Sequence, residues 1–184
     1  MKRAALKLPS APMLMHFTRA SARGSALDNL AAILSAGVIR AARRMVRGQT
    51  AAVCLFDAPL AELKSVLDRR NRRRYEPFGL AIDKRYAFRM GARPVIYLPS
   101  QEAERILEPA QYWRVVSMDL SKNPPLDWSF EREWRIASDL PLEPSLLAAL
   151  VETWRDADEI YERFGGRPPC AGVIPLAELF GRGA

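Results

Sequence analysis

Residues 130–136 read FEREWRI, and this stretch alternates apolar and charged side chains as a half-buried β-strand does. Alternate residues of an extended chain share one face. One face then holds the apolar side chains and an arginine: Phe130, Arg132, Trp134 and Ile136. The opposite face holds only charged side chains: Glu131, Glu133 and Arg135. The charged face is either a solvated surface with cross-strand ion pairs or a cleft wall whose carboxylate stabilises a developing cation.

Six other segments are expected to be extended, because β-branched and aromatic residues lie between Gly, Pro and Asn in them. They are residues 13–18, 51–56, 78–83, 93–98, 112–120 and 171–175, and the FEREWRI strand is expected to continue to residue 138. The residues expected to be mostly buried in this sheet are Phe56, Leu80, Ile82, Val95, Tyr97, Val115, Trp134 and Ile136.

Four segments have helical patterns. Ser25 and Asp28 have the spacing of a capping box, apolar residues follow at helical spacing, and Gly37 ends the helix. A second helix is expected from Asp57 and Pro59 to the basic run 69–74, and others at 101–107 and 144–154, with 164 as an alternative end. Because the elements do not alternate as βαβ units, we expect one α+β domain over residues 1–184, with mostly antiparallel sheets and packed helices.

The composition excludes several classes of protein. Of the 184 residues, 49% are apolar and 27% charged, which is typical of a globular domain and not of a disordered chain. One histidine and two cysteines cannot supply the four ligands of a structural zinc site, so no metal is expected. Cys54 is expected to be a reduced, buried thiol, with a disulfide to Cys170 as the alternative.

The reduced cysteines favour a cytoplasmic protein, and hydropathy predicts no membrane partner. No apolar run reaches the roughly 18 residues of a membrane-spanning helix. The N-terminal apolar stretch is interrupted by Lys7, Pro9 and Pro12 before it attains the length of a signal peptide.

His16 is the single imidazole of the chain and lies in the short strand 13–18. It is either a structural hydrogen-bonding group or the one imidazole available for acid–base chemistry. A nucleophilic triad is not expected, because no GxSxG motif is present.

Two basic runs flank the strand 51–56. Four arginines lie within 40–47 and five within 69–74, and the formal net charge is +7. They are either solvated helix ends, favoured by the helix dipole, or ligands for the phosphates of nucleic acid or a dinucleotide. The candidates for phosphate contacts are Arg43, Arg44, Arg70, Arg73 and Arg74. Neither a Walker A loop nor a GxGxxG motif occurs, so P-loop and Rossmann phosphate sites are not supported.

Several short motifs occur in a characteristic order. They are HFT at 16–18, ILSAGVI at 33–39, VCLFDAP at 53–59, YEPFGLAI at 75–82, PVIY at 94–97 and EREWRI at 131–136. This series resembles the abortive phage-resistance family of the AbiGi type, and is distantly similar to the DNA-modifying ADP-ribosyltransferase toxins. The resemblance covers about residues 14–137, roughly two thirds of the chain. Residues 138–184 lie outside it and are expected to form a C-terminal helical extension and a last strand.

The resemblance implies an ADP-ribosyltransferase-like fold in which NAD, as substrate, lies in a cleft between two small sheets. Glu133 matches the late-strand glutamate that stabilises the oxocarbenium-like transition state, and His16 matches the histidine that holds the nicotinamide and ribose groups. Glu131 completes a Glu-x-Glu pattern similar to the arginine-modifying branch, which is a departure from the histidine branch. Tyr75 is the candidate for stacking on nicotinamide, and Thr18 and Arg135 are further cofactor-binding candidates.

Two functions follow from the resemblance. The first is transfer of ADP-ribose to a nucleic-acid or protein acceptor, in phage defence or a toxin–antitoxin system. The second is a catalytically inactive domain of the same fold that binds nucleic acid or a partner protein, such as a cognate toxin or antitoxin. The first requires His16 and Glu133, 117 positions apart, to face one cleft, and Glu133→Gln is expected to leave folding intact.

Overall fold

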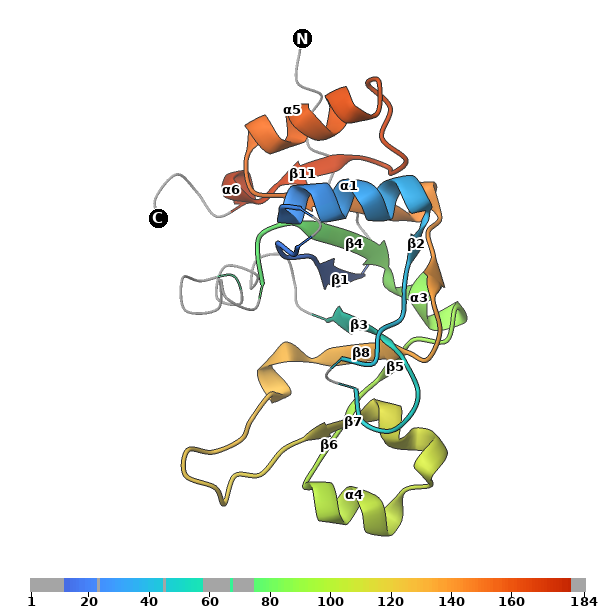
Figure 1. Ribbon diagram of the computed structural model, residues 1–184, viewed down its shortest axis with the longest axis vertical. Coiled ribbons are helices and arrows are strands. Elements are labelled where there is room, and N and C mark those ends of the chain that lie inside the picture. Colours follow the sequence, from blue (N-terminus) through green and yellow to red (C-terminus); the bar gives the residue numbers. More distant parts are fainter. Residues whose placement is uncertain (1–11, 23, 45, 58–66, 68–74, 180–184) are drawn as a thin grey trace.

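Seven strands in the described part of the chain form one sheet in the order β11-β10-β4-β1-β3-β8-β5 (Figure 1). The computed structural model describes residues 12–22, 24–44, 46–57, 67 and 75–179. The strands are β1 (Met13–Phe17), β3 (Val53–Phe56), β4 (Gly79–Asp83), β5 (Arg93–Pro94), β8 (Glu133–Ile136), β10 (Leu147–Val151) and β11 (Val173–Pro175). Neighbouring strands are antiparallel except β10 and β11. The predicted α+β class with a mostly antiparallel sheet is confirmed.

Two small sheets and several helices complete the described fold. β2 (Val38–Ile39) pairs with β9 (Leu140–Pro141), and β6 (Ile96–Leu98) runs parallel to β7 (Val115–Ser117). The α-helices are α1 (Ala26–Ala36), α3 (Lys84–Arg89), α4 (Ser100–Ile106), α5 (Trp154–Arg163) and α6 (Leu176–Leu179). Short 3-10 helices are η2 (Pro109–Arg114), η3 (Ser129–Glu131) and η4 (Pro144–Leu146). None of the helices in the described ranges is long and apolar enough to cross a membrane.

Helix α1 forms where the local sequence signals predict it. The Ser25 side chain accepts from the Asp28 backbone N–H, the Asp28 carboxylate accepts from the Ser25 N–H, and Gly37 ends the helix at φ 63°. An ion pair of 2.8 Å joins Asp28 to Arg163 of α5. Both helices lie on the same side of the sheet (Figure 1).

Two apolar clusters pack against the two faces of the sheet. The cluster under α1 and α5 includes Leu14, Leu55, Leu80 and Ile136, while the neighbouring strand residue Met15 joins the opposite cluster. This alternation along β1 is the period-2 pattern of a strand that is covered on both sides. Burial of each such side chain stabilises the fold by about 1.5–3 kcal/mol.

The structure corrects several predicted elements. Residues 147–151, expected to be helical, form a strand in which all five residues are buried between β4 and β11. Alanine and leucine favour helices intrinsically, and a strand buried on both faces shows no alternation to reveal it. The segment 144–154 therefore contains η4 and β10, and the helix α5 begins only at Trp154.

Three other predicted strands are shorter than expected. Residues 112–114 belong to η2, and 129–131 to η3, so that β7 and β8 begin at Val115 and Glu133. The segment 93–98 divides into β5 and β6, which belong to different sheets. Three residues of the expected core are only half-buried: Val95, Tyr97 and Trp134. The expected second helix, from Asp57 to the run 69–74, lies mostly outside the described residues.

In the large sheet, β1 and β3 share fewer residue pairs than any other two neighbouring strands. β1 pairs with β4 over five residue pairs and β3 with β8 over four, but β1 and β3 share one register pair, Met15 with Phe56. We call this contact the seam. The seam divides the strand order into two parts, β11-β10-β4-β1 and β3-β8-β5, which remain one sheet.

Gly79 is expected to be required for the position of β1. A Cβ at this residue would lie 2.1 Å from the backbone oxygen of His16, so an alanine would force β1 to move. Gly79→Ala should lower the free energy of unfolding by about 1–3 kcal/mol, as overpacking of a core does, measured by urea denaturation. The matched control is Gly172→Ala, whose Cβ would have no neighbour within 4 Å. Equal stability of the two variants would contradict this account of the strand.

Candidate functional site

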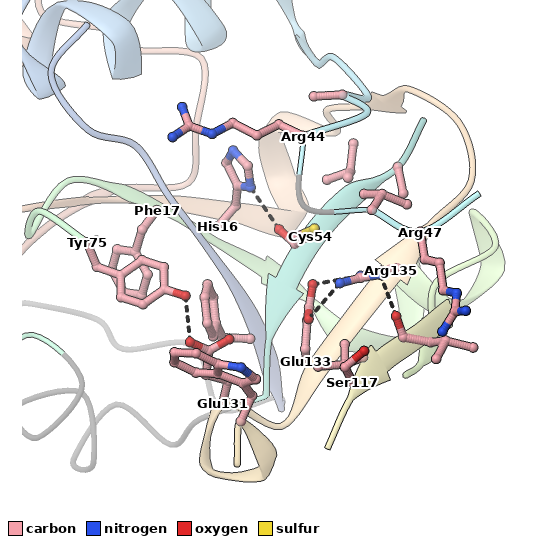
Figure 2. A pocket seen from close by; sticks show the side chains of 18 of the residues that line it. His16, Phe17, Arg44, Arg47, Cys54, Tyr75, Ser117, Glu131, Glu133 and Arg135 are labelled. Atoms are coloured by element: carbon pink, nitrogen blue, oxygen red, sulfur yellow. Dashed lines mark hydrogen bonds and ion pairs between the residues drawn. The ribbon is translucent and has the colours of Figure 1, made fainter. Parts of the chain in front are cut away.

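A pocket of about 790 Å³ lies at the seam. This volume falls within the roughly 300–1,000 Å³ of small-molecule and cofactor sites. His16 and Phe17 line it from β1, Cys54 and Phe56 from β3, and the segments around β7 and β8 close it on the other side (Figure 2). The pocket therefore contains residues from both parts of the sheet.

His16 spans the seam with its side chain. Its Nδ1 lies 3.0 Å from the backbone oxygen of Cys54 (Figure 2). A carbonyl oxygen only accepts hydrogen bonds, so Nδ1 carries the proton and Nε2 is an acceptor. Burial lowers the pKa of His16 below 6.5, although the hydrogen bond to Cys54 opposes the shift. His16 is thus a neutral imidazole whose Nε2 makes no hydrogen bond with the described residues.

Glu131 lies at the end of η3 and is 5% exposed. The Tyr75 hydroxyl donates to its Oε1 over 2.8 Å. The ring of Tyr75 packs edge-on against Phe56, with 4.8 Å between centroids, and Phe17 lies beside both rings. These aromatic rings form one wall of the pocket. The hydrogen bond from Tyr75 positions the Glu131 carboxylate beside this wall.

Glu133 and Arg135 form a bidentate ion pair inside the pocket wall. Arg135 Nε donates to Oε1 over 2.8 Å, and Nη2 donates to Oε2 over 3.1 Å (Figure 2). Arg135 Nη1 donates to the carbonyl oxygens of Trp113 and Val115, at 2.8 and 3.3 Å. Both side chains of the pair are buried. Glu131, Glu133 and Arg135 are therefore buried at the pocket, and the solvated-surface alternative is wrong, but they do not form one strand face because Glu131 lies in η3.

This pairing also changes the expectation that Glu133→Gln leaves folding intact. Removing one member of a buried ion pair leaves an uncompensated charge, which is strongly destabilising. The backbone of Glu133 is fixed as well, because its N–H donates to the Tyr97 hydroxyl and its carbonyl accepts from the Val95 N–H. Glu133 is thus a rigidly held residue of the fold as well as of the pocket.

The Cys54 thiol lies at the same wall. Burial, together with the negative charge of Glu133, raises its pKa to about 12. Cys54 is a free thiol, as expected, but the residue is half-buried rather than buried, and it does not supply a thiolate nucleophile near neutral pH.

Four arginines in addition to Arg135 line the pocket. Arg40 pairs with Asp139, and Arg47 pairs with Glu104 and stacks on the Tyr112 ring. The other two are Arg19 and Arg44, which form no ion pair with any residue in the described ranges. Arg44 lies on the His16 side of the pocket (Figure 2). An anionic ligand would find two uncompensated guanidinium groups here.

The predicted site residues divide into three groups. The pocket is lined by His16, Tyr75, Glu131, Glu133, Arg135 and Arg44. Thr18 and Arg43 do not line it, and the Thr18 hydroxyl instead donates to the Ala26 and Phe78 carbonyl oxygens, at 2.9 and 3.2 Å. These hydrogen bonds hold Thr18 within the fold. Arg70, Arg73 and Arg74 lie outside the described residues.

The sequence analysis missed several lining residues. Arg19 directly follows the HFT motif, so its proximity to His16 in sequence was an available signal. Ser100, Ser117 and Trp128 come from segments whose positions depend on the small β6-β7 sheet, and no local pattern identifies them. Ser100 and Ser117 are joined by a hydrogen bond of 2.7 Å.

The comparisons with known proteins yield no relative: no family model, curated protein or solved structure matches the chain. Among the residues that the structure describes, no group of three His, Cys, Asp or Glu side chains is placed to hold a metal ion.

His16 should make the stability of the protein depend on pH below about 6.5. Its pKa is near 6.5 in the unfolded chain and lower in the folded protein. Between these values the unfolded state binds more protons, so stability falls as the pH is lowered, by at most about 1.4 kcal/mol per pH unit. Urea unfolding from pH 7 to 5 should show this slope, and His16→Asn, which keeps a donor but does not titrate, should reduce it.

The single histidine gives an independent check by NMR. Its ring resonances should titrate with a midpoint below 6.5 in the folded protein. A midpoint at or above 6.5 would show that the ring is not desolvated as described.

Arg135→Met should lower the free energy of unfolding by about 3–5 kcal/mol, because it leaves the Glu133 carboxylate buried without its cation. The double variant Glu133→Met/Arg135→Met should recover part of this loss, since no charge then remains buried. Arg155→Met is the matched control, because Arg155 is exposed on α5, and it should change stability by no more than about 0.5 kcal/mol. An Arg135 variant as mild as the Arg155 control in urea denaturation would rule out an energetically important pair.

Proposed function

We propose that this protein is an NAD-dependent ADP-ribosyltransferase whose pocket at the seam binds NAD. The observation that carries the proposal is one pocket that brings together a neutral histidine, two buried carboxylates and two arginines without ion pairs in the described chain. The order of the sequence motifs supports the same proposal.

The proposed reaction breaks the bond between the ribose C1′ and the nicotinamide nitrogen. Nicotinamide leaves with the bonding electron pair, positive charge develops on the ribose, and a nucleophilic oxygen or nitrogen of the acceptor then bonds to C1′ and loses its proton. A carboxylate held in a partly dry site stabilises that positive charge more than the neutral ground state. Glu133 and Glu131 are the carboxylates available for this role in the pocket.

The other residues have matching roles in the proposal. The unprotonated Nε2 of His16 accepts a hydrogen bond from a ribose hydroxyl or from the carboxamide N–H of nicotinamide. Arg19 and Arg44 hold the pyrophosphate, for which guanidinium geometry is well suited. Tyr75 stands in the aromatic wall, where its hydroxyl orients Glu131. The acceptor is a nucleic acid or a protein, in a phage-defence or toxin–antitoxin setting.

One observation favours the second candidate, an inactive domain that binds nucleic acid or a partner protein. Both oxygens of Glu133 already accept hydrogen bonds from Arg135, which also compensates the carboxylate charge. A carboxylate compensated in this way stabilises a developing cation less than an isolated one. A retained pocket that binds NAD without turnover would correspond to this candidate.

Release of nicotinamide from NAD by the purified protein, with DNA, RNA or protein acceptors present, tests the proposal. Glu133→Gln and Glu131→Gln should each reduce the rate about a hundred- to a thousandfold if both carboxylates act, as in a Glu-x-Glu site. A small effect of Glu131→Gln alone would indicate the histidine-type branch. Circular dichroism must accompany the Glu133 variant, because its ion pair is buried.

Glu162→Gln, an exposed substitution on α5, is the matched control and should keep the full rate. Calorimetric binding of NAD without any turnover would favour the inactive domain over the enzyme. Absence of both binding and turnover would overturn the NAD proposal.

A further inference from the structure

Helix α3 presents a solvent-facing surface of arginine and phenylalanine. Arg85, Phe88 and Arg89 are spaced i, i+3 and i+4, so their side chains lie on one face of the helix. All three are exposed, and the Phe88 side chain is 50% exposed, whereas Ala87 on the other side of the helix is fully buried. Phe88 belongs to neither apolar cluster of the core.

Arg93 adds a third guanidinium group to this surface. Its guanidinium lies over the Phe88 ring, 4.1 Å from the centroid. The Nη1 atom donates to the carbonyl oxygens of Phe88 and Ala92, at 3.0 and 2.7 Å, which fixes the group in this position. One side of the ring is therefore covered by a cation, and the remaining exposed surface of the ring faces solvent. We call Arg85, Phe88, Arg89 and Arg93 the α3 face.

The arginines of the α3 face differ from those that serve the fold. Arg40, Arg47 and Arg163 each pair with a carboxylate elsewhere in the structure. By contrast, no ion pair joins an arginine of the α3 face to a carboxylate in the described chain. The neighbouring lysine, Lys84, is compensated by Asp57. The α3 face thus combines three uncompensated charges with one exposed aromatic ring.

We infer that the α3 face binds single-stranded nucleic acid, with phosphates on the arginines and one base stacked on Phe88. Uncompensated arginines attract the phosphate backbone, and an aromatic ring offers a stacking surface to an unstacked base. A duplex hides its base faces and could use only the charges, so the ring favours a single strand. None of the four residues lines the pocket, and the inference does not depend on NAD chemistry.

Fluorescence anisotropy with a labelled single strand of about 12 nucleotides tests this inference, since single-strand sites span roughly 4–16 nucleotides. The full chain should bind it, and the affinity should fall steeply as salt is raised. Phe88→Ala should weaken binding at least about fivefold, and Phe88→Tyr, which keeps a stacking ring, should bind like the unmodified protein. Arg85→Glu/Arg89→Glu should weaken binding further and reduce its dependence on salt.

Arg155→Glu on α5 is the control for net charge, because Arg155 is also an exposed helix arginine. It should reduce affinity much less than a charge reversal on the α3 face. Phe88→Ala should also leave NAD turnover unchanged, so failure of this inference is distinguishable from failure of the proposed enzyme. The inference would be overturned if a duplex, anionic phospholipid vesicles or polyglutamate bound as tightly as the single strand and Phe88→Ala had no effect. Absence of binding to the single strand would also overturn it.

Discussion

One register pair, Met15 with Phe56, joins β1 to β3 in the large sheet, and the pocket lies beside this pair. The adjoining strand pairings are longer, with five pairs between β1 and β4 and four between β3 and β8. Next to the single register pair between β1 and β3, the His16 side chain donates a hydrogen bond to the Cys54 carbonyl oxygen. The residue that closes the seam is therefore also the one that offers a ring nitrogen to the pocket.

The buried ion pair adds a second constraint on the other side of this opening. Arg135 is held by Glu133 on the same strand and by the carbonyl oxygens of Trp113 and Val115. These contacts connect β8 to η2 and β7, which both lie outside the seven-stranded sheet. Because two desolvated charges are stable only when fully hydrogen-bonded, the pair fixes the pocket wall. Because both Glu133 oxygens already accept hydrogen bonds from Arg135, the Glu133 carboxylate is less able to stabilise a positive charge on a ligand.

Local signals in the sequence predicted part of this structure. The caps of α1 at Ser25 and Gly37 specify its ends without any tertiary contact. The alternation predicted for residues 130–136 separates core from pocket side chains only over Glu133–Ile136, because residues 129–131 form η3 and Phe130, expected on the apolar face, is 52% exposed. His16 and Glu133, which were expected to face one cleft, both line the pocket. Sequence could not show that the charged face is buried, because its cover comes from η2 and β7, nor that residues 147–151 form a central strand, because burial on both faces removes the alternation.

The net charge of +7 describes how strongly the whole chain attracts anions, but it does not say where they bind. The arginines differ in whether each forms an ion pair with a carboxylate. Arg163 ties α5 to α1, and Arg135 fixes a pocket wall, so their charges belong to the fold. Arg44 in the pocket and Arg85 on α3 form no such ion pair in the described chain. A folded protein retains uncompensated arginines at low cost only where water or a ligand solvates them. In the pocket and on the α3 face such arginines lie together beside a cavity or an exposed aromatic ring, and these two surfaces can bind anionic ligands.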